Sequence, residues 1–202
     1  MKKIGDIKKM LSKVKLICWD LDGTLFDTEV MWYNMDKLIV QEYGNELRKE
    51  EASKASEKIA ANAYKTFGYR ANAEKALNYF KEKKYIQVVI NKCDLTNKTM
   101  FNNETVNNTF SFDNFDYIVS EKSFEKKFTD EDMYTKALEL TNILNKKEVI
   151  AICDMPFELR TAKNCGITTV WAKNNDYPFT EVELKEIEEI ADYYVEDFAD
   201  LI

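Results

Sequence analysis

Short apolar runs recur along the chain, and each one stops at polar residues or at a turn. Runs of this length, rich in Val, Ile and Leu, are typical of strands that are buried on both faces of a sheet. They predict β-strands at 14–19, 85–90, 116–120, 148–153 and 167–171. The strands of one sheet are therefore expected to be widely separated along the sequence.

Between these strands, apolar residues recur with the spacing of amphipathic helices. Helices are expected at 4–14, 29–43, 46–67, 71–84, 130–144, 157–165 and 181–194. Thr129 or Asp130 is expected to cap the helix over 130–144. Gly44, Gly68 and Gly166 lie where helices should end, because glycine readily adopts the left-handed conformation that follows many helices.

Strands that alternate with helices predict a parallel sheet with helices on both faces. The expected fold is therefore α/β, a Rossmann-like doubly wound parallel sheet. The helical block after the first strand is expected to form a small inserted helical cap over 28–81, with 1–27 and 82–202 as the core. Ligands of such sheets bind beyond the carboxyl ends of the strands.

Charge and composition narrow the chemistry. The 202 residues include 29 Lys and Arg and 36 Asp and Glu, which gives a formal net charge of −7 at pH 7. An acidic chain is a poor ligand for nucleic acids and for anionic membranes, so neither is expected as a partner. The sequence contains no histidine, which excludes Ser-His-Asp and Cys-His relays and imidazole-rich metal sites. The chemistry must therefore use carboxylates, lysine, amides and hydroxyls.

The four cysteines, at positions 18, 93, 153 and 165, are scattered and have no CxxC spacing. They are therefore expected to be reduced core thiols rather than disulfide or zinc ligands. No run approaches the roughly 20 apolar residues that cross a bilayer, and no export signal is evident. The expected location is the cytoplasm.

Acidic residues follow two of the predicted strands. Asp20 and Asp22 come directly after the strand over 14–19, and Asp154 follows the strand over 148–153. Carboxylates delivered from two strand ends to one edge form an oxygen ligand set of the kind that Mg²⁺ prefers. Gly23 allows a sharp turn and a close approach of the backbone to a ligand.

These residues belong to a pattern of motifs. Asp20-Leu21-Asp22-Gly23-Thr24-Leu25 resembles the first motif of the haloacid dehalogenase-like phosphohydrolases. The segment 115–120, followed by Lys126 and Lys127, is similar to that family's lysine motif. The segment 154–158, together with the helix that follows it, is similar to the family's final acidic motif. The helical block matches the position and size of the family's first-type cap. The resemblance covers the chain from about Val14 onward.

The resemblance implies roles for individual residues. Asp20 would be the nucleophile that becomes an aspartyl-phosphate, and Asp22 the general acid and then base, with a pKa raised relative to that of Asp20. Mg²⁺ would be held by Asp20, the backbone carbonyl of Asp22 and Asp154, with Glu158 binding through water or orienting the ligands. Lys127, or Lys126 if the loop shifts by one residue, would neutralise the phosphoryl oxygens. The residues implied in phosphate binding are Gly23, Thr24, Asn91 and Lys126.

The sequence also departs from the family pattern. At the end of the second strand, where a Ser or Thr is usual, it reads Ile90-Asn91. Either Ile90 occupies the hydroxyl position, or Asn91 substitutes for it. Cys153 stands where Gly is common, Glu158 where Asp is common, and the lysine loop lacks its prolines. None of these changes removes an acidic charge.

The resemblance implies a phosphoric monoester hydrolase that acts on a small phosphorylated metabolite such as a sugar phosphate, phosphoglycolate or a nucleotide. Substrate choice is expected to come from the helical block. Residues there that could face the site are Trp32, Tyr33, Asn34, Asp36, Tyr64 and Arg70. The alternatives are a protein of the same fold that binds a ligand without turnover, and a phosphorelay receiver domain, which leaves the helical insertion unexplained.

Overall fold

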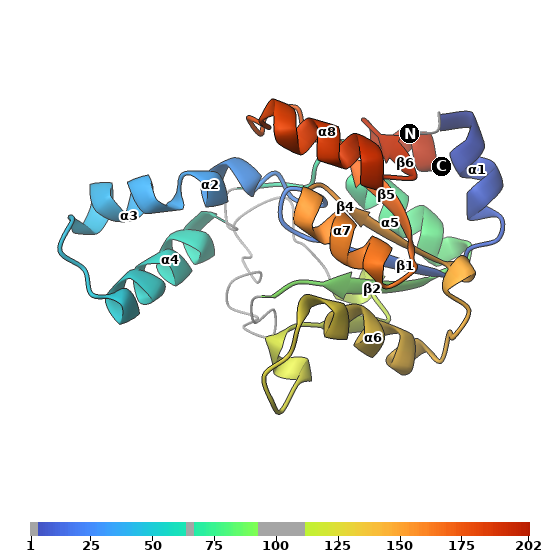
Figure 1. Cartoon of the computed structure of the whole chain (residues 1–202), viewed down its shortest axis with the longest axis horizontal. Helices are drawn as coiled ribbons and strands as arrows, with labels where there is room; N and C mark the ends of the chain where they lie inside the picture. The colour runs from blue at the N-terminus through green and yellow to red at the C-terminus, as the bar shows by residue number, and fades with distance from the viewer. Residues whose placement is uncertain (1–3, 64–66, 93–111) are drawn as a thin grey trace.

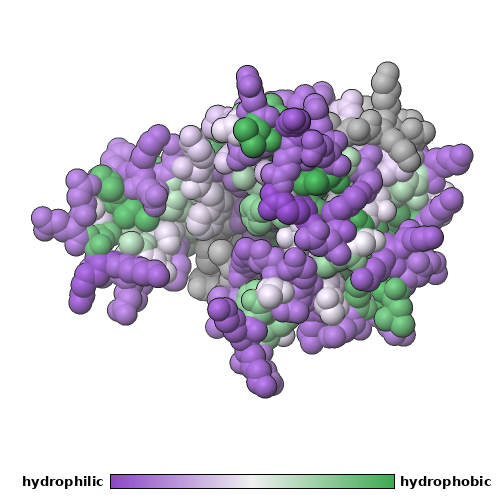
Figure 2. All heavy atoms as spheres, in the orientation of Figure 1, coloured by the Kyte–Doolittle hydropathy of each residue, from purple (hydrophilic) through white to green (hydrophobic). Residues whose placement is uncertain are grey.

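The computed structural model of the chain describes residues 4–63, 67–92 and 112–202 (Figure 1). Tyr64, Cys93 and the polar segment 96–108 lie outside the described residues. No helix within the described part of the chain is long and apolar enough to cross a membrane. The face of the molecule in Figure 2 is mostly hydrophilic, and apolar side chains gather on the helices that project from the sheet.

A six-stranded parallel sheet forms the centre of the molecule, in the order β3-β2-β1-β4-β5-β6. The strands are β1 Leu16–Trp19, β2 Ile86–Ile90, β3 Tyr117–Val119, β4 Val149–Cys153, β5 Thr168–Ala172 and β6 Tyr193–Val195. The predicted Rossmann-like α/β class is thereby confirmed, and the five predicted strands agree with the structure to within two residues at each end.

The sixth strand corrects the prediction of a helix over 181–194. The helix α8 (Glu181–Ile190) ends earlier, and Tyr193–Val195 pairs with β5. The chain is hydrogen-bonded to the edge of β5 just before this strand, where the amide of Thr169 donates to the Asp192 carboxylate at 3.1 Å. Pairing with an existing strand edge overrides the local helical pattern, and the aromatic residues of β6 suit a strand.

Helices cover both faces of the sheet (Figure 1). α1 (Ile4–Leu11), α5 (Ala73–Glu82) and the 3₁₀ helix η5 (Phe198–Leu201) lie on one face, and α6 (Asp130–Thr141) and α7 (Pro156–Asn164) on the other. Alternation along β1 separates the two cores: Ile17 and Trp19 join the first, whereas Leu16 and Cys18 join the second. The remaining described 3₁₀ helices are η2 Phe112–Asn114, η3 Glu121–Ser123 and η4 Lys146–Glu148.

Three helices between β1 and α5 project away from the sheet (Figure 1): α2 Glu29–Tyr33, α3 Met35–Tyr43 and α4 Lys49–Ala63. The helix expected over 29–43 is interrupted at Asn34, whose side chain donates to the Val30 carbonyl at 2.8 Å. At the base of the projection, Phe26 and Tyr69 form a β-bridge, and their rings stack at 5.1 Å.

The cap expected from the sequence, 28–81, includes nearly all of α5. In the structure α5 packs on the sheet, where Ala76, Leu77 and Phe80 join the core. We therefore propose that the inserted unit consists of the residues between Phe26 and Tyr69, the two residues of the bridge. In this division α5 belongs to the core.

Candidate active site

The carboxyl ends of β1 and β4 bring the two acidic motifs together. Trp19, the last residue of β1, lies opposite Ile152 in β4, and the Asp20 amide donates to the Ile152 carbonyl at 3.0 Å. Asp154 follows directly after β4. Residues that are distant in sequence therefore reach one edge of the sheet, as the strand pattern predicts.

Glu158 completes a group of three carboxylates. It lies in the first turn of α7, and one oxygen each from Asp20, Asp154 and Glu158 lies within 4.8 Å of the others. The buried atoms Asp20 Oδ2, Asp154 Oδ2 and Glu158 Oε2 accept no hydrogen bond from the described residues. Converging carboxylate oxygens without a donor fit a divalent cation, which supplies the positive charge that they lack.

The electrostatics of the group agree with this fit. Burial, followed by repulsion between neighbouring carboxylates, raises the pKa values of Asp20, Asp154 and Glu158 well above their ordinary range. Without a cation, this cluster therefore binds protons more tightly than free carboxylates do. The low pKa expected of Asp20 as a nucleophile requires a positive ion beside it, because burial alone acts in the opposite direction.

Gly23 allows the loop after β1 to pass close to this cluster. Its φ is +77°, and a Cβ atom at this position would lie 2.2 Å from Asp154 Oδ2. No side chain fits there without displacing the Asp154 carboxylate. The sequence predicts that the backbone at Gly23 approaches a ligand closely. In the structure it is the Asp154 carboxylate of the cluster that this backbone approaches.

Asp154 is held in place by its neighbours. Thr24, which is fully buried, donates to Asp154 Oδ1 at 3.3 Å, and the indole of Trp171 donates to the Asp154 carbonyl at 3.0 Å. Thr24 was expected in phosphate binding, and here its hydroxyl orients a carboxylate. One oxygen of Asp154 is thereby fixed and the other remains directed into the cluster.

The carboxylate of Asp22 has a different environment. Thr28 donates to its Oδ1 at 2.6 Å, and the Asn91 amide donates to its Oδ2 at 3.1 Å. Its side chain is not among the three carboxylates that converge. Asn91, which was expected to contact phosphate, therefore holds Asp22 beside Asp20.

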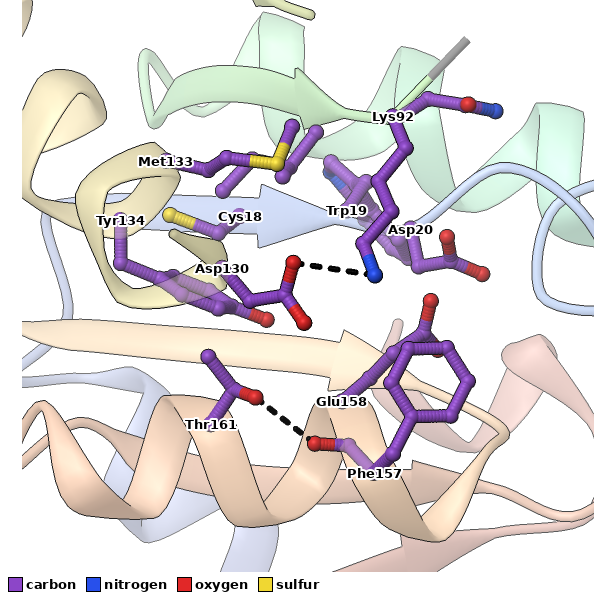
Figure 3. A pocket seen from close by; sticks show the side chains of 12 residues that line it. Cys18, Trp19, Asp20, Lys92, Asp130, Met133, Tyr134, Phe157, Glu158 and Thr161 are labelled. Carbon is purple, nitrogen blue, oxygen red and sulfur yellow. Dashed lines mark hydrogen bonds and ion pairs between the residues drawn. The ribbon is translucent and has the colours of Figure 1, made fainter. Parts of the chain in front are cut away.

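A cavity of about 40 Å³ opens beside Asp20 (Figure 3). It is lined by Cys18, Trp19, Asp20, Ile90, Asn91, Lys92, Asp130, Met133, Tyr134, Phe157, Glu158 and Thr161. Lys92 forms an ion pair with Asp130 at 2.9 Å, and its ammonium lies 5.2 Å from the centre of the Phe157 ring. Lys126 and Lys127, the lysines expected at the site, are exposed and do not line this cavity.

Sequence reasoning missed Lys92, Asp130 and Glu29. Lys92 carries a detectable signal, because it follows the end of β2 and so belongs to the same sheet edge as Asp20. Glu29 begins α2, and burial together with repulsion from Asp22 raises its pKa from 4.5 to about 7. Its proximity to the cluster depends on the path of the loop after Gly23, which no sequence pattern specifies.

Most residues that were expected to face a substrate from the helical block have other partners. Trp32 packs against the core, and Tyr33 makes an edge contact with Tyr177 at 5.4 Å. Asp36 is exposed. The Arg70 guanidinium donates to the backbone carbonyls of Gly23 at 2.6 Å, Ala172 at 3.3 Å and Lys173 at 2.5 Å.

Arg70 therefore joins the loop after β1 to the end of β5. Burial lowers its pKa, and the nearby Asp154 carboxylate opposes that shift. A guanidinium with several backbone carbonyl partners is a structural clamp, whereas the sequence analysis named Arg70 only as one of the residues that could face the site.

Comparison with known proteins agrees with this geometry. The family model described as haloacid dehalogenase-like hydrolase matches residues 17–102 and 75–172. A search of curated proteins found no match. A hydrolase from Pseudomonas syringae is similar in structure, with a TM-score of 0.70 and 18% identity over 93% of this chain and 95% of that one.

Two further solved structures share the fold. A predicted phosphoglycolate phosphatase from Haemophilus somnus has a TM-score of 0.69 and 15% identity, over 94% of this chain and 96% of that one. CbbY from Rhodobacter sphaeroides, solved in complex with phosphate, has a TM-score of 0.67 and 16% identity, over 93% and 96% of the two chains. Since the family model extends over most of the sequence and the sheet agrees with it, this chain belongs to the haloacid dehalogenase-like hydrolases.

Proposed function

We propose that the protein is a Mg²⁺-dependent phosphatase that hydrolyses a small phosphorylated metabolite through an aspartyl-phosphate on Asp20. The observation that carries this proposal is the convergence of Asp20, Asp154 and Glu158, whose buried oxygens lack donors, with Asp22 held beside them. Oxygen ligands from carboxylates favour Mg²⁺ among the common divalent ions.

In the first half of the reaction, a carboxylate oxygen of Asp20 attacks phosphorus, and the bond from phosphorus to the ester oxygen breaks. Asp22 donates a proton to that leaving oxygen. In the second half, Asp22 takes a proton from water while the water oxygen attacks phosphorus. The bond to Asp20 then breaks, which releases inorganic phosphate and restores the carboxylate.

When bound, Mg²⁺ would supply positive charge that offsets the repulsion between the nucleophile and the phosphoryl oxygens. Asp20, Asp154 and Glu158 would hold it, together with the Asp22 backbone carbonyl. Thr24 fixes Asp154, and Thr28 and Asn91 hold the Asp22 carboxylate where it can transfer a proton. These neighbours keep the reacting groups in place before the substrate arrives.

The size of the cavity and the chemistry of the structural neighbours support a compact phosphate ester. A cavity of about 40 Å³ beside Asp20 has room for a small polar group rather than for a large one. One neighbour, CbbY from Rhodobacter sphaeroides, was solved with phosphate and, as a mutant, with xylulose-(1,5)-bisphosphate. These observations support the compact members of the expected substrate class, a small sugar phosphate or phosphoglycolate, over a nucleotide.

Hydrolysis of p-nitrophenyl phosphate tests the proposal. We expect turnover that requires Mg²⁺, that stops in excess EDTA and that resumes when Mg²⁺ is restored. Asp20→Asn should abolish turnover, because the amide is not a nucleophile, while Asp36→Asn, an exposed residue of α3, should leave it unchanged. A protein that binds Mg²⁺ but turns over no member of a broad panel of phosphate esters would instead be a binding protein with this fold.

A further inference from the structure

Among the described residues that line the cavity beside Asp20, carboxylates outnumber cations. Asp20, Asp130 and Glu158 contribute carboxylates, and Lys92 is the one lysine or arginine among those described lining residues. Transfer of a phosphoryl group to a carboxylate brings together two anions, the carboxylate and the phosphoryl group. A metal ion neutralises the phosphoryl oxygens on one side only, so a second cation must lie on the other side. The described part of the cavity offers Lys92 for this role.

The strand register places Lys92 at the site. Val89 in β2 lies opposite Trp19 in β1, so Ile90 is level with Asp20. Ile90 is the last residue of β2, and it and the two residues that follow it, Asn91 and Lys92, line the cavity. In Figure 3 the ammonium of Lys92 lies between the carboxylate of Asp130 and those of Asp20 and Glu158.

Asp130 and Phe157 hold this ammonium near the cavity without trapping it. Asp130 begins α6, where the helix dipole favours a negative charge. The ion pair is half exposed, with 53% of the Lys92 side chain and 38% of the Asp130 side chain accessible. Ion pairs as exposed as this one are weak, so the ammonium can exchange Asp130 for a phosphoryl oxygen.

The loop that contains Lys126 and Lys127 has a different role in the structure. Phe124 and Phe128 flank the two lysines, and their rings stack at 4.5 Å against the core beneath α6. With both ends of this short segment anchored by aromatic rings, the lysines between them are directed into solvent.

We propose that Lys92, at the end of β2, is the catalytic residue that neutralises the transferring phosphoryl group in this protein, in place of a lysine from the loop before α6. Asp130 is its counter-ion in the absence of substrate. The inference rests on the proposed phosphatase function and concerns the same site.

Kinetics of single variants test the assignment. With p-nitrophenyl phosphate and saturating Mg²⁺, Lys92→Ala should lower kcat/KM by about 100-fold or more. Lys92→Arg should recover much of this loss, because it keeps the charge. Lys126→Ala and Lys127→Ala should each remain within about twofold of the wild type.

Asp130→Asn is the matched control for the ion pair. It breaks the same contact as Lys92→Ala but keeps the ammonium, so its kcat/KM should fall by a smaller factor than that of Lys92→Ala. A loss in Asp130→Asn as large as that in Lys92→Ala would overturn the proposal, since the ion pair itself would then be what matters. Wild-type kinetics in Lys92→Ala, or loss of activity in Lys126→Ala or Lys127→Ala, would also overturn it.

Binding of vanadate separates this inference from the function on which it rests. If the wild type hydrolyses no ester, the phosphatase proposal fails, but Mg²⁺-dependent vanadate binding can still be measured by calorimetry. Binding that is weakened by Lys92→Ala and kept by Lys127→Ala supports the assignment of Lys92 as the anion contact. Equal binding by wild type and Lys92→Ala contradicts it.

Discussion

At the scale of single residues, two glycines share a backbone conformation but differ in what surrounds them. Gly23 and Gly44 both have positive φ, +77° and +85°. A Cβ at Gly23 would lie 2.2 Å from Asp154 Oδ2, whereas a Cβ at Gly44 would meet nothing within 4 Å. Substitutions at these two glycines therefore distinguish the loss of stability from a strained backbone, which both share, from the effect of placing a Cβ against Asp154, which occurs at Gly23 alone.

We expect Gly23→Ala to abolish Mg²⁺ binding and Gly44→Ala to leave it intact. Both variants should lose about 1 kcal/mol or more of stability, because an L-residue is strained at positive φ. Calorimetric titration with Mg²⁺ and thermal unfolding of both variants measure the two effects. Mg²⁺ binding by Gly23→Ala at wild-type affinity would contradict the placement of Asp154 in the metal site.

Sequence reasoning found the acidic residues of the candidate site, and it missed Lys92, which we propose as the cation of that site. Asp20, Asp22, Gly23 and Asp154 stand next to apolar strands, so strand pattern and motif agree on their position. Lys127 was selected from the order of motifs alone. Its orientation depends on how Phe124 and Phe128 pack, and that packing is a tertiary property which the local sequence does not encode.

At the scale of elements, Arg70 connects the segment behind the insertion to the core. Its guanidinium donates to carbonyls of the loop after β1 and of the end of β5, and its backbone amide donates to the Leu25 carbonyl at 2.9 Å. A buried cation bonded to several carbonyls leaves those acceptors without partners when it is removed. The clamp therefore couples the base of the insertion to the loop that holds Gly23.

Arg70→Met should lower the free energy of unfolding by about 2–4 kcal/mol and should weaken Mg²⁺ binding, since the Gly23 loop loses its support. Arg48→Met is the control. Arg48 is exposed in its ion pair with Glu51, so its loss should leave the stability close to that of the wild type. Denaturant unfolding compares the two variants. Equal stability of Arg70→Met and wild type would show that the clamp is not needed.

The sheet was largely predictable at this scale, apart from one edge. Strands β1, β2, β4 and β5 are short apolar runs, and the hydrophobic pattern of the sequence predicts each of them. The strand β6 reads as the end of a helix, because Ile187, Ile190 and Ala191 continue the helical spacing toward it. Only the free edge of β5 turns Tyr193–Val195 into a strand, and an edge is a feature of the assembled sheet.

At the scale of the whole molecule, the acidic cluster makes stability depend on pH. Asp20, Asp154 and Glu158 have pKa values raised well above normal, and that of Glu29 is raised from 4.5 to about 7. A raised pKa means that the folded protein holds the proton more tightly than the unfolded chain does. Protonation therefore favours the folded state of the metal-free protein.

For Glu29, both states are protonated below pH 4.5 and the group has no effect on stability. Between pH 4.5 and about 7 the unfolded chain loses this proton first, so the folded state becomes progressively less favoured. The pKa values of the three clustered carboxylates are also raised, so these groups act in the same direction. Groups with lowered pKa values, such as Asp132 and Glu148, titrate below this range.

We therefore expect the melting temperature of the metal-free protein to fall as the pH rises from about 5 to about 7. Mg²⁺ should raise the melting temperature more at pH 8 than at pH 6, because at lower pH it must displace protons from the same oxygens. Glu29→Gln should flatten the metal-free slope, since it removes one of the contributing groups. Differential scanning calorimetry in EDTA and in Mg²⁺ measures both effects. A metal-free melting temperature that stays constant or rises over this range would mean that these carboxylates are not buried together, and the site would then lack the charge density that calls for a metal.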